Sequence, residues 1–227
     1  MKLIYKSAII LYLLILTSDV YSQEFFRLKE SMGMPLRSRV YNDIKGTPYF
    51  VDNWSKGIIK QANGQIFNDI ELKYDQLEDE VIYKDINGKE LGFAVPVIEF
   101  RIDYSFNGLK KSSLFRNGFE PFKGSTEKSY YEILYDGTFK LAKKNVKHIE
   151  QYREYNSAVT TKSIIERIKY YYFAKNTLVE FKRDNKSIQQ AFGEKAPLIL
   201  AYIKENDLDL KKDVDLIHIF NFYNSLL

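Results

Sequence analysis

Five short turn signals divide the middle of the chain into strand-length segments. Each signal is an Asn-Gly or Asp-Gly pair, whose residues readily adopt the positive φ angles that a tight hairpin turn requires. The pairs are Asn63-Gly64, Asn87-Gly88, Asn107-Gly108, Asn117-Gly118 and Asp136-Gly137. They predict a meandering antiparallel sheet with positive φ at both residues of each turn.

The segments between these turns have a period of two. Residues 98–106 alternate apolar with polar side chains, and residues 69–74 do the same with Ile70, Leu72 and Tyr74 on the apolar side. Such a pattern indicates one buried and one solvated face. We therefore interpret the charges of residues 58–74 as a solvated sheet face rather than a site. Further strands are expected at residues 80–86, 130–135 and 139–149, and a last hairpin within residues 167–183.

After Asp184 the period changes to about 3.6, which is typical of helices. We expect the first helix to be capped by Ser187 and to end at Gly193, the second to begin at Ala196-Pro197, and the third to be capped by Asp213. Two groups are predicted to face inward: Leu198, Ile199, Tyr202 and Ile203 in the second helix, and Leu216, Ile217, Phe220, Tyr223 and Leu227 in the third.

These patterns predict an α+β fold. Its β-rich domain, residues 23–183, is an antiparallel, hairpin-rich sheet that is curved or partly closed. Two or three short C-terminal helices, within residues 184–227, pack on the sheet, because helices this short need a partner surface.

The first 22 residues have the pattern of a signal peptide. Lys2 and Lys6 precede an apolar run over residues 8–16, and the small residues Val20 and Ser22 fit the positions before a cleavage site. The run is shorter than the roughly 20 residues of a membrane span. We expect export to the periplasm, the outer membrane or the medium, with no transmembrane span in the mature chain.

Composition limits the possible partners. The chain has no cysteine, so neither a disulfide scaffold nor lipid attachment to a cysteine is possible. Loss of two lysines and one aspartate with residues 1–22 would lower the formal charge from +4 to +3. A nearly balanced, exported chain is not expected to bind nucleic acid.

No catalytic motif is recognisable. His148 and His218 lie far apart in the sequence, and no GxSxG, Walker A or GxGxxG pattern occurs. We therefore assign no catalytic residue, metal ligand or cofactor. Aromatic residues are abundant, with 18 Tyr and 16 Phe, and Tyr49, Phe50 and Trp54 are the candidates to line a ligand groove. The alternative is a strand with one aromatic face.

Residues 46–85, beginning GTPYFVDNW, and residues 175–224, beginning KNTLVEFKR, resemble uncharacterised exported proteins of Bacteroidetes-type Gram-negative bacteria. The VYSQ end of the signal peptide is similar to theirs. The resemblance implies a location in the cell envelope and no particular activity.

Three functions fit these observations. We place first a non-enzymatic envelope protein that binds a protein or peptide partner. The second is a carrier that holds a lipid or other apolar ligand inside a curved aromatic sheet. The third is an envelope hydrolase without a recognisable motif, which would need a cleft where acidic residues or a histidine converge.

Overall fold

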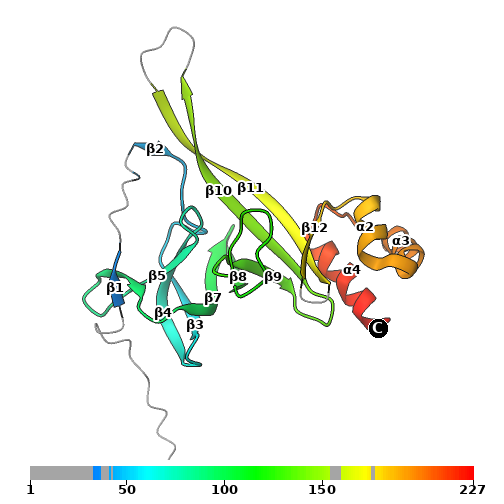
Figure 1. Cartoon of the computed structure of the whole chain (residues 1–227), viewed down its shortest axis with the longest axis horizontal. Coiled ribbons are helices and arrows are strands. Elements are labelled where there is room, and N and C mark those ends of the chain that lie inside the picture. Colours follow the sequence, from blue (N-terminus) through cyan, green and yellow to red (C-terminus); the bar gives the residue numbers. More distant parts are fainter. Residues whose placement is uncertain (1–32, 37–40, 42, 154–159, 175–176) are drawn as a thin grey trace, which may run out of the picture.

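The computed structural model describes residues 33–36, 41, 43–153, 160–174 and 177–227 (Figure 1). The predicted signal peptide and the Lys175-Asn176 part of the last predicted turn lie outside the described residues. Within the described part, twelve strands form one open, mixed sheet. They are β1 (Gly33–Pro35), β2 (Ile44–Lys45), β3 (Ser55–Gln61), β4 (Ile66–Asp75), β5 (Glu80–Lys84), β6 (Glu90–Phe93), β7 (Val97–Phe106), β8 (Leu109–Arg116), β9 (Tyr131–Tyr135), β10 (Leu141–Arg153), β11 (Thr160–Ala174) and β12 (Thr177–Phe181).

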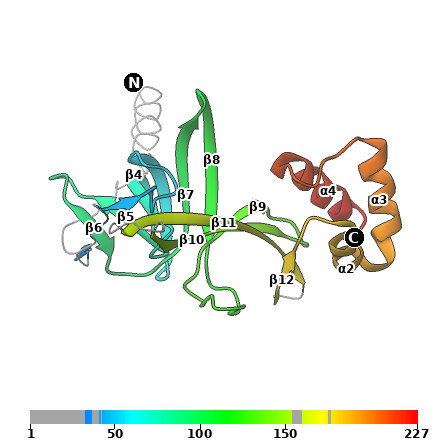
Figure 2. The same ribbon diagram turned by 90° about the horizontal axis from the view of Figure 1, so that it is seen from above.

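The strand order is β1-β6-β5-β4-β3-β7-β8-β9-β10-β11-β12. Neighbours in this order pair antiparallel, and β2 adds a short parallel pairing with β11. The predicted antiparallel, β-rich α+β fold is confirmed at this level. Figures 1 and 2 show that the long β10–β11 hairpin runs across the direction of β7 and β8, so the sheet bends between these two parts.

The turns are less uniform than predicted. Only Asn107-Gly108 has positive φ at both residues, 51° and 76°. At Asn63-Gly64 only the glycine has positive φ. Gly64 N donates to Gln61 O, and Gln61 N donates to Gln65 O. This is a three-residue loop with a bulge at the glycine, the next most common hairpin connection.

The other three pairs also differ from the prediction. Asn87-Gly88 repeats the three-residue loop, with Gly88 N donating to Asp85 O. Asn117-Gly118 opens the long loop between β8 and β9, and Asp136-Gly137 joins β9 to β10 without positive φ at either residue. Three of the five pairs therefore located a tight hairpin loop, and only Asn107-Gly108 has the predicted turn type.

A β-bulge in β4 changes which of its residues face the core. Asp69 has a φ of 56°, and the register shifts so that Ile59 faces Phe67 while Gly57 faces Ile70. Phe67 and Ile70 therefore share a face although they are three residues apart. Beyond the bulge, the alternation predicted for Ile70, Leu72 and Tyr74 holds, since Leu72 and Tyr74 are buried and Ile70 is half-buried.

Both faces of the sheet are covered near β11. Tyr170 and Tyr172 belong to an apolar cluster with the helices, while Tyr171 and Phe173 belong to a separate cluster on the other face. Successive strand residues point to opposite faces. The uninterrupted aromatic run of residues 170–173 is therefore the signature of a strand buried on both sides.

The helices are α2 (Asn185–Phe192), α3 (Ala196–Glu205) and α4 (Asp213–Ser225), with a 3₁₀ turn at Gly193–Lys195. They lie at one end of the β10–β11 hairpin (Figure 2). The end of α2 at Gly193 and the start of α3 at Ala196 match the prediction. Of the described helices, none is both long and apolar enough to cross a membrane.

Several details of the helices were predicted wrongly. The side chain that caps α2 is Asp184, which accepts from Ser187 N at 2.7 Å, and not Ser187. Asp213 lies inside α4, whose N-cap is Lys212. Leu198 and Leu227, predicted to face inward, are 56% and 64% exposed.

Candidate functional site

A cavity of about 460 Å³ lies between the segment 47–51 and the strands β4, β7, β8, β9, β10 and β11. We call it the lysine–aromatic cavity, because aromatic rings and lysines make up most of its wall. Its lining residues are Thr47, Tyr49, Phe50, Val51, Tyr74, Gln76, Tyr104, Phe106, Lys111, Phe115, Tyr130, Glu132, Lys143, Lys144, Asn145, Lys147, Glu166 and Ile168.

Phe50 is the centre of the apolar wall. Its ring packs edge-on against Tyr104 at 5.1 Å and against Phe115 at 5.0 Å between centroids. Tyr74 also packs against Phe115, at 5.0 Å between centroids. Because strand residues alternate, Tyr104 and Phe115 project from the paired strands β7 and β8 toward the same side. The result is a rigid aromatic surface suited to an apolar group.

Lys147 is the nearly buried cation of the cavity, with 5% of its side chain exposed. Its Nζ donates to Tyr49 O at 2.7 Å and to Thr47 O at 3.0 Å. The nearest carboxylate oxygen in an ion pair with it is Glu166 Oε2 at 4.0 Å. Burial lowers the pKa of Lys147, and Glu166, Asp52 and Asp75 oppose that shift only in part. A lysine ammonium has three donors, so one remains beyond the two carbonyls.

Lys143 is neutralised by close carboxylates. Its Nζ lies 2.9 Å from Glu132 Oε2 and 2.8 Å from Asp213 Oδ2. Burial lowers the pKa of Lys143, but the ion pairs with Glu132 and Asp213 outweigh it, so that the pKa is raised overall. Ser113 Oγ donates to Glu132 at 2.7 Å, and Tyr170 OH donates to Asp213 at 2.6 Å. This network joins the cavity wall to α4.

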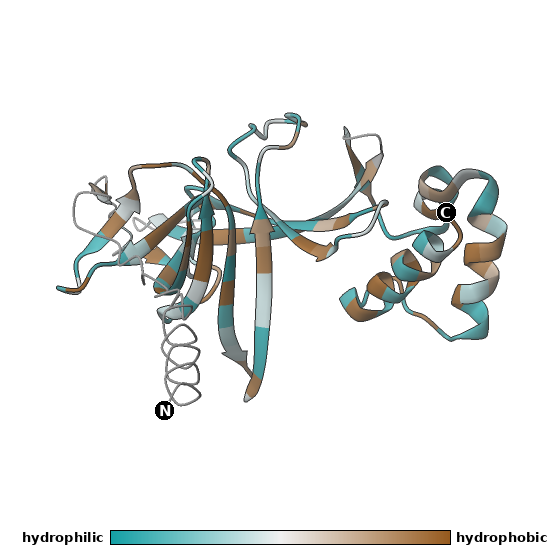
Figure 3. Ribbon diagram, turned by 90° about the horizontal axis from the view of Figure 1, so that it is seen from below, coloured by the Kyte–Doolittle hydropathy of each residue, from teal (hydrophilic) through white to brown (hydrophobic). Residues whose placement is uncertain are grey.

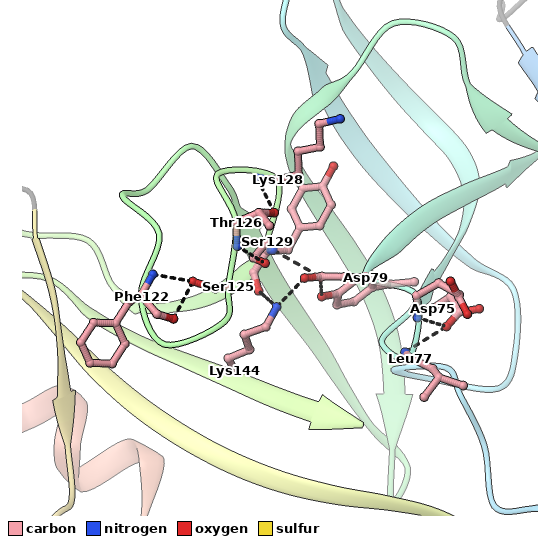
Figure 4. Close-up of polar contacts among 12 residues, drawn as sticks. Asp75, Leu77, Asp79, Phe122, Ser125, Thr126, Lys128, Ser129 and Lys144 are labelled. Carbon is pink, nitrogen blue, oxygen red and sulfur yellow. Dashed lines mark hydrogen bonds and ion pairs between the residues drawn. The ribbon is translucent and has the colours of Figure 1, made fainter. Parts of the chain in front are cut away.

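Asp79 joins the β4–β5 turn to the opposite side of the cavity. Figure 4 shows Asp79 and Lys144 pointing toward one another, with Lys144 Nζ at 2.6 Å from Asp79 Oδ2. The other carboxylate oxygen accepts from Tyr74 OH at 2.6 Å and from Tyr130 N at 3.3 Å. Lys144 also donates to Tyr130 O at 2.9 Å. Asp79 therefore connects β4, the residue before β9, and β10.

The remaining lysine of the wall, Lys111, is exposed, as are Phe106 and Ile168, and we call the side of the cavity that these three residues line its mouth. Lys111 Nζ lies 4.8 Å from the centroid of the Phe106 ring. Lys143 and Lys144 are held by carboxylates, so the positive charge that a ligand would meet comes from Lys147 inside and Lys111 outside.

The three predicted ligand-binding residues do not form one site. Tyr49 and Phe50 line the lysine–aromatic cavity, whereas Trp54 lines an adjoining, more polar hollow together with Asp52. The two hollows share Val51, Tyr104 and Lys111 as lining residues. Lys73 connects them, because its Nζ lies 4.3 Å from the Tyr49 ring centroid and 5.2 Å from that of Trp54. Trp54 is therefore a neighbour of the cavity wall and not part of it.

Lys147 was the important residue that the sequence did not indicate. It follows Leu141, Lys143 and Asn145 at alternate positions of β10, so a lysine in the inward phase of a strand was the available signal. This signal could not be interpreted from the sequence, because the hydrogen-bond partners of Lys147, Thr47 and Tyr49, lie about a hundred residues earlier.

The two histidines do not meet. His148 Nε2 lies 2.8 Å from Glu150 Oε1 on β10, and His218 is exposed on α4. Among the described residues, no group of three or more His, Cys, Asp or Glu side chains is arranged to hold a metal ion.

No protein-family model matches the sequence, and neither a curated protein nor a solved structure shows significant similarity to it. The functional argument therefore depends on the cavity itself.

Proposed function

We propose that the chain is a non-enzymatic exported envelope protein that binds an amphipathic ligand in the lysine–aromatic cavity. The ligand carries an anionic group and an apolar chain or ring. The observation that carries the proposal is Lys147, a nearly buried lysine in an aromatic cavity that is held mainly by two neutral carbonyl groups. The pattern of residues 1–22 supports export.

A buried charge is costly unless it is paired and hydrogen-bonded. Among the described residues, the ion-pair partner of Lys147 is Glu166 at 4.0 Å, and Asp52 and Asp75 add weaker attraction. An anionic headgroup beside Nζ would compensate it at a shorter distance, with a charge-assisted hydrogen bond of about 1.5–3 kcal/mol.

The aromatic wall supplies the second half of the recognition. Phe50, Tyr104 and Phe115 would cover an apolar chain, and apolar burial contributes roughly 25 cal/mol per Å². The cavity volume of about 460 Å³ falls within the range of roughly 300–1,000 Å³ that is usual for small-molecule sites. These inward-facing rings favour a ligand carrier over the protein- or peptide-binding module that the sequence placed first.

Binding is tested with three molecules: oleate, oleyl alcohol and acetate. We expect oleate to displace the anionic fluorophore anilinonaphthalene sulfonate, oleyl alcohol to do so weakly, and acetate not at all. In K147M, oleate affinity should fall about 10- to 100-fold, which corresponds to the loss of one charge-assisted hydrogen bond. K89M, at the exposed β5–β6 turn, is the matched control and should bind as the unaltered protein does.

Stability must be measured alongside affinity. The pKa of Lys147 is lower in the folded state than its ordinary value of 10.5, so its charge destabilises the folded state at neutral pH. This destabilisation is relieved as the pH rises through the folded-state pKa toward 10.5. Removing that charge offsets the loss of two hydrogen bonds, so K147M should unfold at a urea concentration close to that of the unaltered protein. Equal affinity for oleate and oleyl alcohol, or full affinity in a folded K147M, would contradict the proposal.

A further inference from the structure

The β7–β8 hairpin ends in an exposed apolar tip. The hairpin extends away from the neighbouring strands in Figure 2, and its free end has apolar colouring in Figure 3. Phe106 and Leu109 are 55% and 66% exposed. We propose that this tip inserts into the surface of an anionic lipid bilayer and docks the protein there.

The turn holds the two apolar side chains together. Asn107 and Gly108 form the tight turn, and Phe106 and Leu109 are direct partners in the ladder. Directly opposed residues of a hairpin project on the same side, with their Cβ atoms roughly 5 Å apart. The tip therefore presents a paired apolar wedge, while single exposed apolar residues elsewhere need no explanation.

The charge around the wedge determines which kind of surface it fits. Lys110 and Lys111 follow Leu109 directly, both are exposed, and residues 104–112 include no acidic residue. Basic side chains next to an inserted apolar group are attracted to anionic headgroups. An anionic bilayer offers both an apolar interior for the wedge and negative headgroups for the lysines, so we take the lipid surface as the partner.

The wedge is continuous with the lysine–aromatic cavity. Phe106 and Lys111 line the mouth of that cavity, and the half-exposed Ile168 lines it from β11. Docking through the tip would therefore place the mouth at the bilayer surface, from which an amphipathic ligand could enter. This last step rests on the proposed function, whereas the docking itself does not.

The test is flotation of the protein, purified from its own host's envelope, with vesicles of phosphatidylcholine alone or mixed with phosphatidylglycerol. We expect binding to the mixed vesicles, at least a tenfold weaker partition for F106S/L109S, and loss of the preference for phosphatidylglycerol in K110E/K111E. I66S/L198S is the matched control, because Ile66 and Leu198 are 55% and 56% exposed on other elements, and it should bind as the unaltered protein does.

Two further measurements separate this proposal from the previous one. K147M should lose oleate affinity and keep its binding to mixed vesicles, so failure of either proposal is visible by itself. A tryptophan at the tip, in F106W, should shift its emission to shorter wavelength on adding mixed vesicles, beyond any change from Trp54. Unchanged flotation of F106S/L109S, or equal binding to both kinds of vesicle, would overturn the docking proposal.

Discussion

Asp213 is the residue through which the polar network of the cavity reaches the helices. Its carboxylate accepts from Lys143 on β10 and from Tyr170 on β11. In D213N the side chain keeps its shape and loses its charge, so we expect the free energy of unfolding at neutral pH to fall by about 1.5–3 kcal/mol, as for one hydrogen bond to a charged group. Equilibrium urea unfolding measures this change.

The pH dependence of the same residue has a defined sign. The pKa of Asp213 is lower than its ordinary value of 3.8, because the hydrogen bonds from Lys143 and Tyr170 outweigh the effect of burial. Its stabilising contribution is therefore complete above that ordinary value and is lost as the pH falls through the lower, folded-state pKa. D213N should lose less stability than the unaltered protein between pH 5 and 2, roughly the range in which such a carboxylate titrates. Parallel acid limbs of the two stability curves would contradict this assignment.

At the scale of elements, an aromatic cluster attaches the helices to the sheet, in addition to the polar network through Asp213. Phe220 on α4 is fully buried and packs against Phe139, Phe181 and Phe192. F220A should lower the free energy of unfolding by about 3–5 kcal/mol, because it removes a large core side chain. F222A, on the same helix, should cost less, since Phe222 is half-buried and stacks on Tyr202.

Hydrogen exchange locates the effect of F220A. If the cluster attaches the helices, amides of α2, α3 and α4 should lose protection before those of β3 and β7. Uniform loss of protection over the whole chain would show instead that sheet and helices unfold as one cooperative unit.

The sequence was a good guide to these elements and an uneven guide to their ends, since Gly193 and Ala196 were placed correctly but the two predicted caps were not. Period-two segments identified β4, β5, β7, β9 and β10 because burial on one face constrains every second residue. Caps failed because Asp184, Ser187 and Asp213 can all bond nearby backbone, and only the path of the chain decides which does. The register bulge at Asp69 and the extension of β10 to Arg153 left no pattern in the sequence that we could recognise.

At the scale of the whole molecule, the cavity exists because the bend of the sheet brings β10 back to the segment 47–51 and the β4–β5 turn. Lys147 bonds to Tyr49 O, and Lys144 to Asp79, across separations of 98 and 65 residues. Local patterns carry no information about such distances. The aromatic half of the site, Tyr49 and Phe50, could be proposed from sequence, whereas the cationic half could not.

The bend itself should depend on Asp79, which holds Lys144, Tyr74 and the backbone of Tyr130 at once. D79A leaves a lysine with 14% exposure and a buried tyrosine hydroxyl without this acceptor, so we expect a loss of about 3–5 kcal/mol, as when one partner of a buried ion pair is removed. D79N is the matched control. Asp79 has a φ of 57°, which asparagine also tolerates, and the amide oxygen can still accept from Tyr74.

Both variants lose the charge of Asp79, whereas only D79A also loses the acceptor for Tyr74 and a residue type that tolerates positive φ. D79N should lose less stability than D79A. Both variants should bind oleate more weakly, and D79A should do so more than D79N, because it releases the β4–β5 turn from β10 more completely. Hydrogen exchange should rise at Leu77 and Glu78 and along the middle of β10 in D79A, and less in D79N. If D79A unfolds at the same urea concentration as the unaltered protein, the cavity is held in shape by its aromatic packing, and the connection through Asp79 is dispensable.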